Sequence, residues 1–255
     1  MKEQPTLRAT LYLIFSLLGM LVGGFFPTPI SSLCHLFLVI LALATEKWLF
    51  EGEALPQLSV SSLWRRARLW LLFPAFLLAT VSVNILSGKM TVALGGTLPD
   101  LAPTPMLFIG AVLIAPIAEE LLFRGLLMRL FRRFGDVWAL LLTATLFALA
   151  HGDLFQMPYA LVAGLFLGAF ALASGGVLFP IIVHFLYNLL AFFGDDIPTA
   201  PLLWSLLGLT LFSRLLLFLG ERPHLSKRGR KPKGRELFPL LVYAAAMVTL
   251  AILNF

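Results

Sequence analysis

The stretch that decides the fold is residues 116–125, PIAEELLFRG, in which two glutamates and an arginine interrupt an apolar run from about 105 to 130. A charge at the centre of a bilayer costs at least roughly 2.5–3.5 kcal/mol, so chains keep such residues where they pair or do chemistry. Glu120 and Arg124 are four residues apart and share a helical face, where they can pair. Glu119 is turned about 100° away from them. Its partner has to come from another segment of the chain.

The composition is typical of a membrane protein. Of the 255 residues, 60% are hydrophobic and 13% are charged, and the mean hydropathy is +0.95. Soluble domains are nearer half apolar and a quarter charged. The single cysteine, Cys34, excludes an internal disulfide framework and any multi-cysteine metal site. We predict an all-α transmembrane helical bundle that forms one integral membrane domain over residues 1–255.

Several stretches approach the ~20 apolar residues that a membrane span requires. We predict nine spans, or eight if one of the shorter stretches does not cross. They are about 9–26, 30–50, 69–87, 105–129, 137–151, 157–173, 177–193, 201–220 and 237–254. The fifth, sixth and seventh stretches are short, as is typical of helices that are enclosed by others or line a cavity. Residues 58–68 contain a tryptophan and several arginines, which indicates a segment at the membrane interface.

The basic residues are unevenly distributed between the two sides of these spans. If the N-terminus is cytoplasmic, nearly all of the 19 lysines and arginines are cytoplasmic, while Lys89 lies outside and Arg124 and Arg214 lie within spans. The positive-inside rule therefore predicts a cytoplasmic N-terminus, and we expect the bacterial cytoplasmic membrane as the location. The loop 221–236 contains the run KRGRKPKGR. We interpret this run as an orientation signal and a contact for anionic lipid headgroups, and we predict no nucleic-acid partner.

Few other polar residues lie deep in the predicted spans. His151 follows Phe147 by four residues and Asn188 follows His184 by four, so the members of each pair share a helical face. At 1.5 Å per residue, Glu119, His184, Asn188 and His151 lie roughly 11 to 21 Å from the cytoplasmic ends of three different spans. We therefore predict that these side chains form one buried site, within a catalytic core at about 105–193.

These residue types together can hydrolyse a peptide bond without a serine or cysteine nucleophile. A buried glutamate can act as a general base, and a histidine beside it can hold the water. His184 and Asn188 can donate hydrogen bonds to a developing oxyanion. The same residues could instead bind zinc through Glu119, His151 and His184, with an open position for water. Each residue alone also has a structural interpretation, and Phe147 is interpreted as core, but their conjunction favours a site.

At these residues the sequence resembles the CPBP family, the CAAX-processing and bacteriocin-processing intramembrane proteases, also called the Abi family. The family pattern is EExxxR, then FxxxH, then HxxxN or HxxxD, and this chain matches all three in order within residues 116–193. The resemblance implies an all-helical membrane core and a glutamate-dependent endopeptidase. It also implies roles for individual residues: Glu119 activates water beside His151, His184 and Asn188 donate to the oxyanion, and Glu120, Arg124 and Phe147 support the site.

The sequence leaves other functions open. A non-proteolytic membrane scaffold could keep the same residues, and a proton-coupled transporter could use Glu119, His151 and His184 as a relay. The intact motifs count against the scaffold, and the lack of paired broken helices or an inverted repeat counts against the transporter. We predict hydrolysis of a membrane-associated peptide or protein with no bound metal, because Glu120 is better used against Arg124 than in orienting a histidine ligand. Zinc is the alternative.

Overall fold

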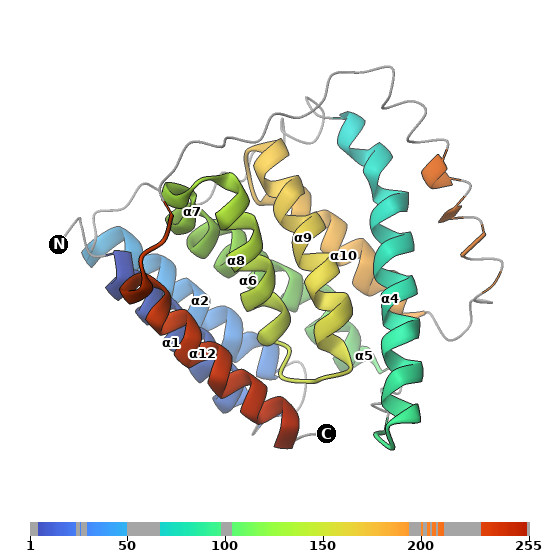
Figure 1. Cartoon of the computed structure of the whole chain (residues 1–255), viewed down its shortest axis with the longest axis horizontal. Helices are drawn as coiled ribbons and strands as arrows, with labels where there is room; N and C mark the ends of the chain where they lie inside the picture. Colours follow the sequence, from blue (N-terminus) through green and yellow to red (C-terminus); the bar gives the residue numbers. More distant parts are fainter. Residues whose placement is uncertain are drawn as a thin grey trace.

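A computed structural model describes residues 5–23, 30–49, 67–97, 104–193 and 231–253, together with position 26 and several positions between 200 and 211. These residues form helices and turns, with no strand among them, so the predicted all-α fold is confirmed. Figure 1 shows the helices side by side in an up-and-down bundle. The predicted interfacial segment 58–68, the predicted span 201–220 and the basic loop 221–236 lie largely outside the described residues.

Each of the other predicted spans corresponds to a helix or to a continuous helical run. Their bounds are α1 (Pro5–Gly23), α2 (Ile30–Leu49), η1 (Ala67–Leu72) with α4 (Phe73–Ala93), a run from Pro105 to Phe134, α8 (Asp136–Leu149), α9 (Gln156–Ser174), α10 (Leu178–Phe192) and α12 (Gly234–Leu253). The run consists of α5 (Pro105–Leu107), η2 (Phe108–Ile114), α6 (Ala115–Glu120), η3 (Leu121–Leu127), α7 (Met128–Phe131) and η4 (Arg132–Phe134).

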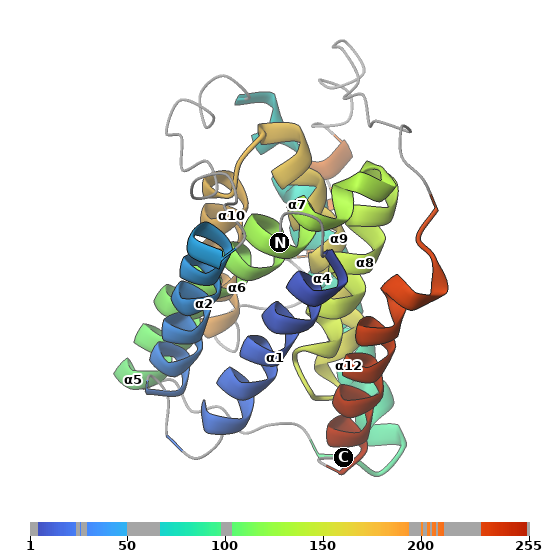
Figure 2. The same ribbon diagram turned by 90° about the vertical axis from the view of Figure 1, so that its left-hand side faces the viewer.

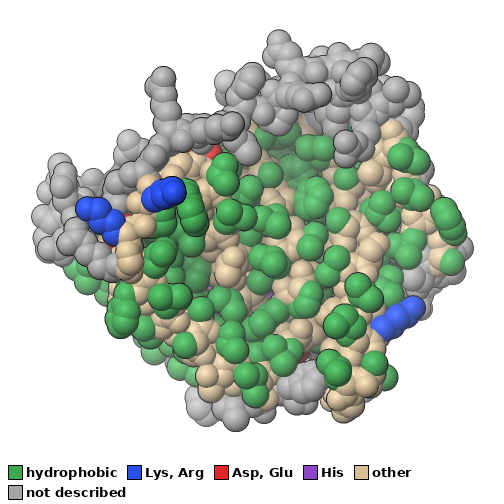
Figure 3. All heavy atoms as spheres, in the orientation of Figure 1, with side chains coloured by type: hydrophobic (Ala, Val, Ile, Leu, Met, Phe, Trp, Pro, Cys, Tyr) green, Lys and Arg blue, Asp and Glu red, His purple; other side chains and the backbone are tan. Residues whose placement is uncertain are grey.

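The outer surface of the bundle is suited to lipid. Among the described residues, four helical stretches are long and apolar enough to cross a membrane: Ile30–Trp48, Leu69–Ala93, Pro105–Phe134 and Gln156–Ser174. Figure 3 shows hydrophobic side chains spread over the visible face, with lysines and arginines near its edge. Large apolar side chains such as Phe37 and Leu241 are 65% exposed. Because a soluble protein rarely leaves so much apolar surface uncovered, the chain is a membrane protein.

The described basic residues mark one end of the bundle. The start of α1, the end of α2, α7 and the start of α12 lie together at the upper left in Figure 1. These elements carry Arg8, Lys47 and Arg129, and Lys233 directly precedes α12, whereas Lys89 lies in the last turns of α4, which ends on the opposite side. The charge asymmetry expected from the sequence is thus present in the folded chain. The orientation of the bundle in the membrane stays a prediction.

Aromatic side chains hold α4 against α9 and α10. The ring of Phe76 is fully buried and lies 6.2 Å from Phe170 and 5.6 Å from Tyr187, measured between ring centroids. Ser87 Oγ, two turns before the end of α4, donates a hydrogen bond of 2.6 Å to the carbonyl of Phe155. This bond fastens α4 to the loop between α8 and α9, and so fixes one wall of the site described below.

Glycines bring α8 and α9 close together. A Cβ atom at Gly164 would lie 3.0 Å from the Cα of Ala144, and one at Gly168 would lie 2.6 Å from Leu140 Cδ1. Small residues four apart on one helical face allow backbones in a membrane to approach closely. The spacing Gly164-x-x-x-Gly168 therefore sets the distance between the two helices.

We expect Gly164→Ala to destabilise the bundle, because its methyl group meets the backbone of α8 and the helices must separate. Overpacking of this kind costs about 1–3 kcal/mol, which thermal unfolding of the purified protein in detergent would detect. Gly234→Ala is the matched control, since a Cβ there meets no atom within 4 Å. Equal stability of the two variants would show that the close contact between α8 and α9 is not required.

Candidate active site

The two glutamates end a short α-helical segment, α6, that lies between the π-helical stretches η2 and η3. The amide of Ala115 donates to the carbonyl of Gly110. In this register the carbonyl of Ala111 would need the amide of residue 116, but Pro116 has no N–H. Asn188 Nδ2 supplies the missing donor, at 2.8 Å from Ala111 O. The side chain of Asn188 therefore fastens α10 to η2 as well as facing the site.

Glu120 and Arg124 form a fully buried ion pair, as their spacing led us to expect. Arg124 Nη1 lies 2.9 Å from Glu120 Oε1, and both side chains are 0% exposed. Arg124 Nη2 donates to the carbonyl of Gly164 at 3.1 Å, and its guanidinium carbon lies 4.6 Å from the ring centroid of Phe147. The guanidinium is thus held by a carboxylate, a carbonyl and an aromatic face, which are contacts that make a buried charge tolerable.

His184 connects the two carboxylates. Its Nδ1 lies 3.0 Å from Glu120 Oε1, and its Nε2 lies 3.9 Å from Glu119 Oε2. One oxygen of Glu120 therefore serves both Arg124 and His184. Glu120 thus pairs with Arg124 as expected and, in addition, orients the ring of His184, which the sequence analysis did not expect.

His151 lies just beyond the end of α8, not within the helix as the predicted span 137–151 implied. The helix ends at Leu149 because Gly152 adopts a left-handed conformation, with φ of +62°. The amide of His151 donates to Ala148 O, which leaves the carbonyl of Phe147 without its helical donor. The Nδ1 atom of the His151 ring lies 2.9 Å from this carbonyl. When Nδ1 carries the proton for this bond, Nε2 is available to accept a proton.

Glu119 faces a cavity of about 460 Å³, within the usual range for ligand pockets. Its side chain is 21% exposed, and its Oε2 atom is buried without a hydrogen-bond partner. Glu120 also has an unpartnered oxygen, Oε2, but its side chain is fully buried and its Oε1 is engaged by Arg124 and His184, whereas Glu119 lines the cavity. The two neighbouring carboxylates are therefore in different chemical situations.

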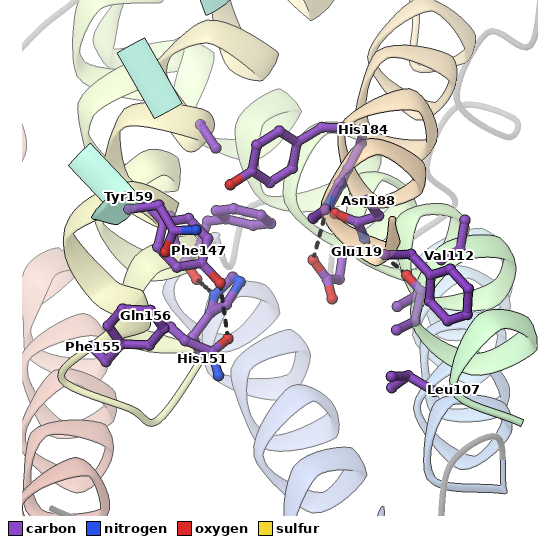
Figure 4. A pocket seen from close by; sticks show the side chains of 18 residues that line it. Leu107, Val112, Glu119, Phe147, His151, Phe155, Gln156, Tyr159, His184 and Asn188 are labelled. Atoms are coloured by element: carbon purple, nitrogen blue, oxygen red, sulfur yellow. Dashed lines mark hydrogen bonds and ion pairs between the residues drawn. The ribbon is translucent and has the colours of Figure 1, made fainter. Parts of the chain in front are cut away.

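The cavity brings together four of the residues predicted from the sequence. Figure 4 shows Glu119, His184 and Asn188 on one side, and His151 facing them from the other. Phe147 lies against the rings of both histidines, with centroids 5.0 Å from His151 and 5.7 Å from His184. Glu120 and Arg124 lie behind this wall rather than in it.

The sequence analysis missed the polar residues on the far wall of the cavity. Asn84 of α4 lines the cavity, and its Oδ1 is buried without a partner. Gln156 and Tyr159 of α9 also line it, and their side chains are joined by a hydrogen bond of 3.2 Å. Asn84 could have been found from the sequence, because it is a strongly polar residue within a predicted span. Gln156 and Tyr159 stand near a helix start, where polar residues are common and carry no such signal.

The zinc alternative needs three protein ligands close together. Among the described histidines, cysteines, aspartates and glutamates, no three are grouped closely enough to hold a metal ion. One feature of a zinc site is nevertheless present, because the Glu120 carboxylate orients the ring of His184.

The residues of this site lie in a segment that matches a known protein family. Residues 101–190 match the family described as type II CAAX prenyl endopeptidase Rce1-like. The match supports the CAAX protease family that the sequence motifs resemble. The comparisons with curated proteins and with solved structures find no match.

The CAAX protease segment contains every site residue predicted from the sequence, from Glu119 to Asn188. The match supports, in general terms, a CAAX-type intramembrane endopeptidase that acts on a membrane-associated peptide. Helices α1, α2, α4 and α12 lie outside the matched segment. Asn84, on α4, therefore belongs to the part of this chain that the family match does not cover.

We expect Arg124→Ala to lower the stability of the CAAX protease core as well as its activity. Removing one partner of a buried ion pair costs about 3–5 kcal/mol, because the other charge is left uncompensated. Arg132→Ala is the matched control: Arg132 pairs with Asp136 at the same i,i+4 spacing, but its side chain is 55% exposed. Thermal unfolding should separate the two variants. An inactive Arg124→Ala protein of normal stability would instead place Arg124 in the reaction itself.

Proposed function

We propose that the protein is an intramembrane endopeptidase that hydrolyses a peptide bond of a membrane-associated peptide with a water activated by Glu119. The observation that carries the proposal is that the two neighbouring carboxylates have different surroundings. Glu120 is fully buried and its Oε1 is engaged by Arg124 and His184, whereas Glu119 is 21% exposed and lines the cavity. A carboxylate with an unengaged oxygen in a cavity of peptide-binding size is placed to accept a proton from water.

The reaction begins when Glu119 accepts a proton from water as the water oxygen attacks the peptide carbonyl. The new C–O bond forms and the electron pair of the carbonyl moves to its oxygen. Collapse of this intermediate breaks the C–N bond, and the proton held by Glu119 passes to the leaving amine. His151 supports the first step. Its Nδ1 is directed to Phe147 O, so its Nε2 can accept a hydrogen bond from the water.

His184 and Asn188 stabilise the oxyanion from the same side of the cavity. A protonated His184 donates from Nδ1 to Glu120 and retains a second donor at Nε2, which faces the cavity. Asn188 uses one hydrogen of its amide on Ala111 O and retains the other. Donors that are already oriented before the charge develops contribute about 10²–10³ in rate each.

In this proposal protein side chains catalyse the reaction without a bound metal. Asn188 supports it, because its amide lies one helical turn from His184 and suits an oxyanion as a donor better than it suits zinc as a ligand. The contact between Glu120 and His184 is the one observation that favours the zinc alternative with Glu119, His151 and His184.

We expect Glu119→Gln to abolish cleavage of membrane-associated peptides while leaving the fold intact, because glutamine keeps the shape but cannot accept the proton. General-base catalysis contributes about 10²–10⁴-fold, so kcat should fall by at least about 10². The matched control is Glu46→Gln on α2, where the carboxylate binds Arg8 outside the cavity. The measurement is peptide cleavage by purified, folded protein. Retained cleavage by Glu119→Gln would exclude Glu119 as the base.

We expect the purified, active protein to contain no stoichiometric metal and to keep its activity after prolonged chelation. The measurements are elemental analysis and cleavage before and after chelation. Near-stoichiometric zinc, with activity lost on its removal and restored on its return, would make Glu119, His151 and His184 ligands.

A further inference from the structure

A second cavity of about 190 Å³ lies on the other side of Glu119, toward α1 and α2. It shares Glu119, Phe147 and His151 with the larger cavity, and its remaining wall comes mainly from the first two helices. In the run that carries the glutamates, α2 packs against α6 and α1 packs against η3, and Figure 2 shows α2 beside α6. Glu119 therefore stands in a wall between two cavities.

The second cavity has a polar lining along one face of α2. His35, Ser31 and Ser32 all line it, and they are spaced three and four residues apart, so they share a helical face. Gly19 of α1 makes room for the imidazole, because a Cβ at this position would lie 3.1 Å from His35 Cδ2. Neither His35 nor the serines belong to the segment that matches the CAAX protease family.

Two buried polar atoms in this lining lack partners. His35 Nε2 and Glu119 Oε2 are both inaccessible and make no hydrogen bond with the protein. Buried polar groups are almost always hydrogen-bonded, to ordered water where protein supplies no partner. The cavity has room for several molecules, since water occupies about 30 Å³ each in the liquid.

The position of this cavity matters for hydrolysis. A peptide bound in the larger cavity excludes water from the side on which it lies, yet the reaction consumes a water molecule. The second cavity touches the same carboxylate from the side of α1 and α2. Its polar lining begins in the first turn of α2, at the end of the bundle opposite Lys47.

We propose that the cavity between α1, α2 and Glu119 is water-filled and supplies the hydrolytic water, and that His35 is a positioning residue that holds this water against Glu119. That the cavity is water-filled is independent of the proposed function. That its water is consumed in hydrolysis rests on the proposed function. The water is held by His35 Nε2 and Glu119 Oε2, and a serine hydroxyl can take its remaining hydrogen bond. Attack then proceeds from the α2 side while the peptide remains in the larger cavity.

The first test measures water in the cavity without requiring activity. In a Cys34→Ala background, which removes the native cysteine, Ser32→Cys and Leu33→Cys each carry one thiol. Ser32 lines the cavity, whereas Leu33 is 50% exposed on the outer, lipid-facing side of α2. In lipid nanodiscs a small charged methanethiosulfonate should modify Ser32→Cys at least about tenfold faster, because the reactive thiolate forms only in contact with water. Equal rates would show that the cavity is dry and would overturn the proposal.

The second test measures the role of His35 in the reaction. His35→Leu removes the polar atom and should lower kcat by about 10- to 100-fold with little change in KM, because the peptide occupies the other cavity. His35→Gln places an amide near the position of Nε2 and should recover much of kcat. A merely structural role would move thermal stability, and glutamine would not rescue it selectively. Unchanged kcat in His35→Leu would exclude His35 as the positioning residue.

The two tests separate failure of this proposal from failure of the proposed function. Fast labelling of Ser32→Cys in a protein that cleaves no peptide would leave the water cavity standing and reject the hydrolytic role. Peptide cleavage that requires Glu119, together with slow labelling and an unaffected His35→Leu variant, would keep the protease and reject the water cavity.

Discussion

The buried pair of Glu120 and Arg124 is the interaction on which the rest of the structure depends. Both side chains are fully enclosed, so each charge must be compensated by the protein. The compensation comes from several helices: Gly164 O lies on α9, the ring of Phe147 on α8, and His184 on α10. The same contacts that neutralise the charges therefore fix the relative positions of these helices. The need to compensate these two buried charges therefore contributes both to the stability of the bundle and to the geometry of the site.

Two of the site residues also complete the hydrogen bonding of the backbone. His151 takes the place of its own amide on the carbonyl of Phe147, and Asn188 takes the place of the N–H that Pro116 lacks. A buried carbonyl needs a hydrogen-bond donor, and here side chains supply it. The four-residue spacing of Phe147 and His151 has a direct reason here, since a ring four residues on lies beside the unpaired carbonyl. Each of these side chains is positioned by the bond it makes to the backbone.

Each of the two glutamates has one buried oxygen without a partner, but Glu120 Oε1 is bonded to Arg124 and His184 whereas Glu119 lines the cavities. A buried carboxylate oxygen with no hydrogen bond destabilises a fold, and proteins keep such groups where function requires them. Here Glu119 separates two cavities, one lined by the family segment and α4, the other lined by α1 and α2. The first two helices thus contribute to the surroundings of the glutamate, although the family match does not extend to them.

The sequence alone determined the helical membrane fold, because hydrophobic runs of membrane length admit few other structures. It also determined the pairing of Glu120 with Arg124, because that contact is local to one helix. Only the tertiary structure placed His184 between both carboxylates and ended α8 before His151, because these features depend on contacts between helices and on a turn. His35 was equally invisible: it lies more than eighty residues from Glu119 in the chain, and no motif connects them. A shared cavity between distant helices is decided by packing, which a single sequence does not display.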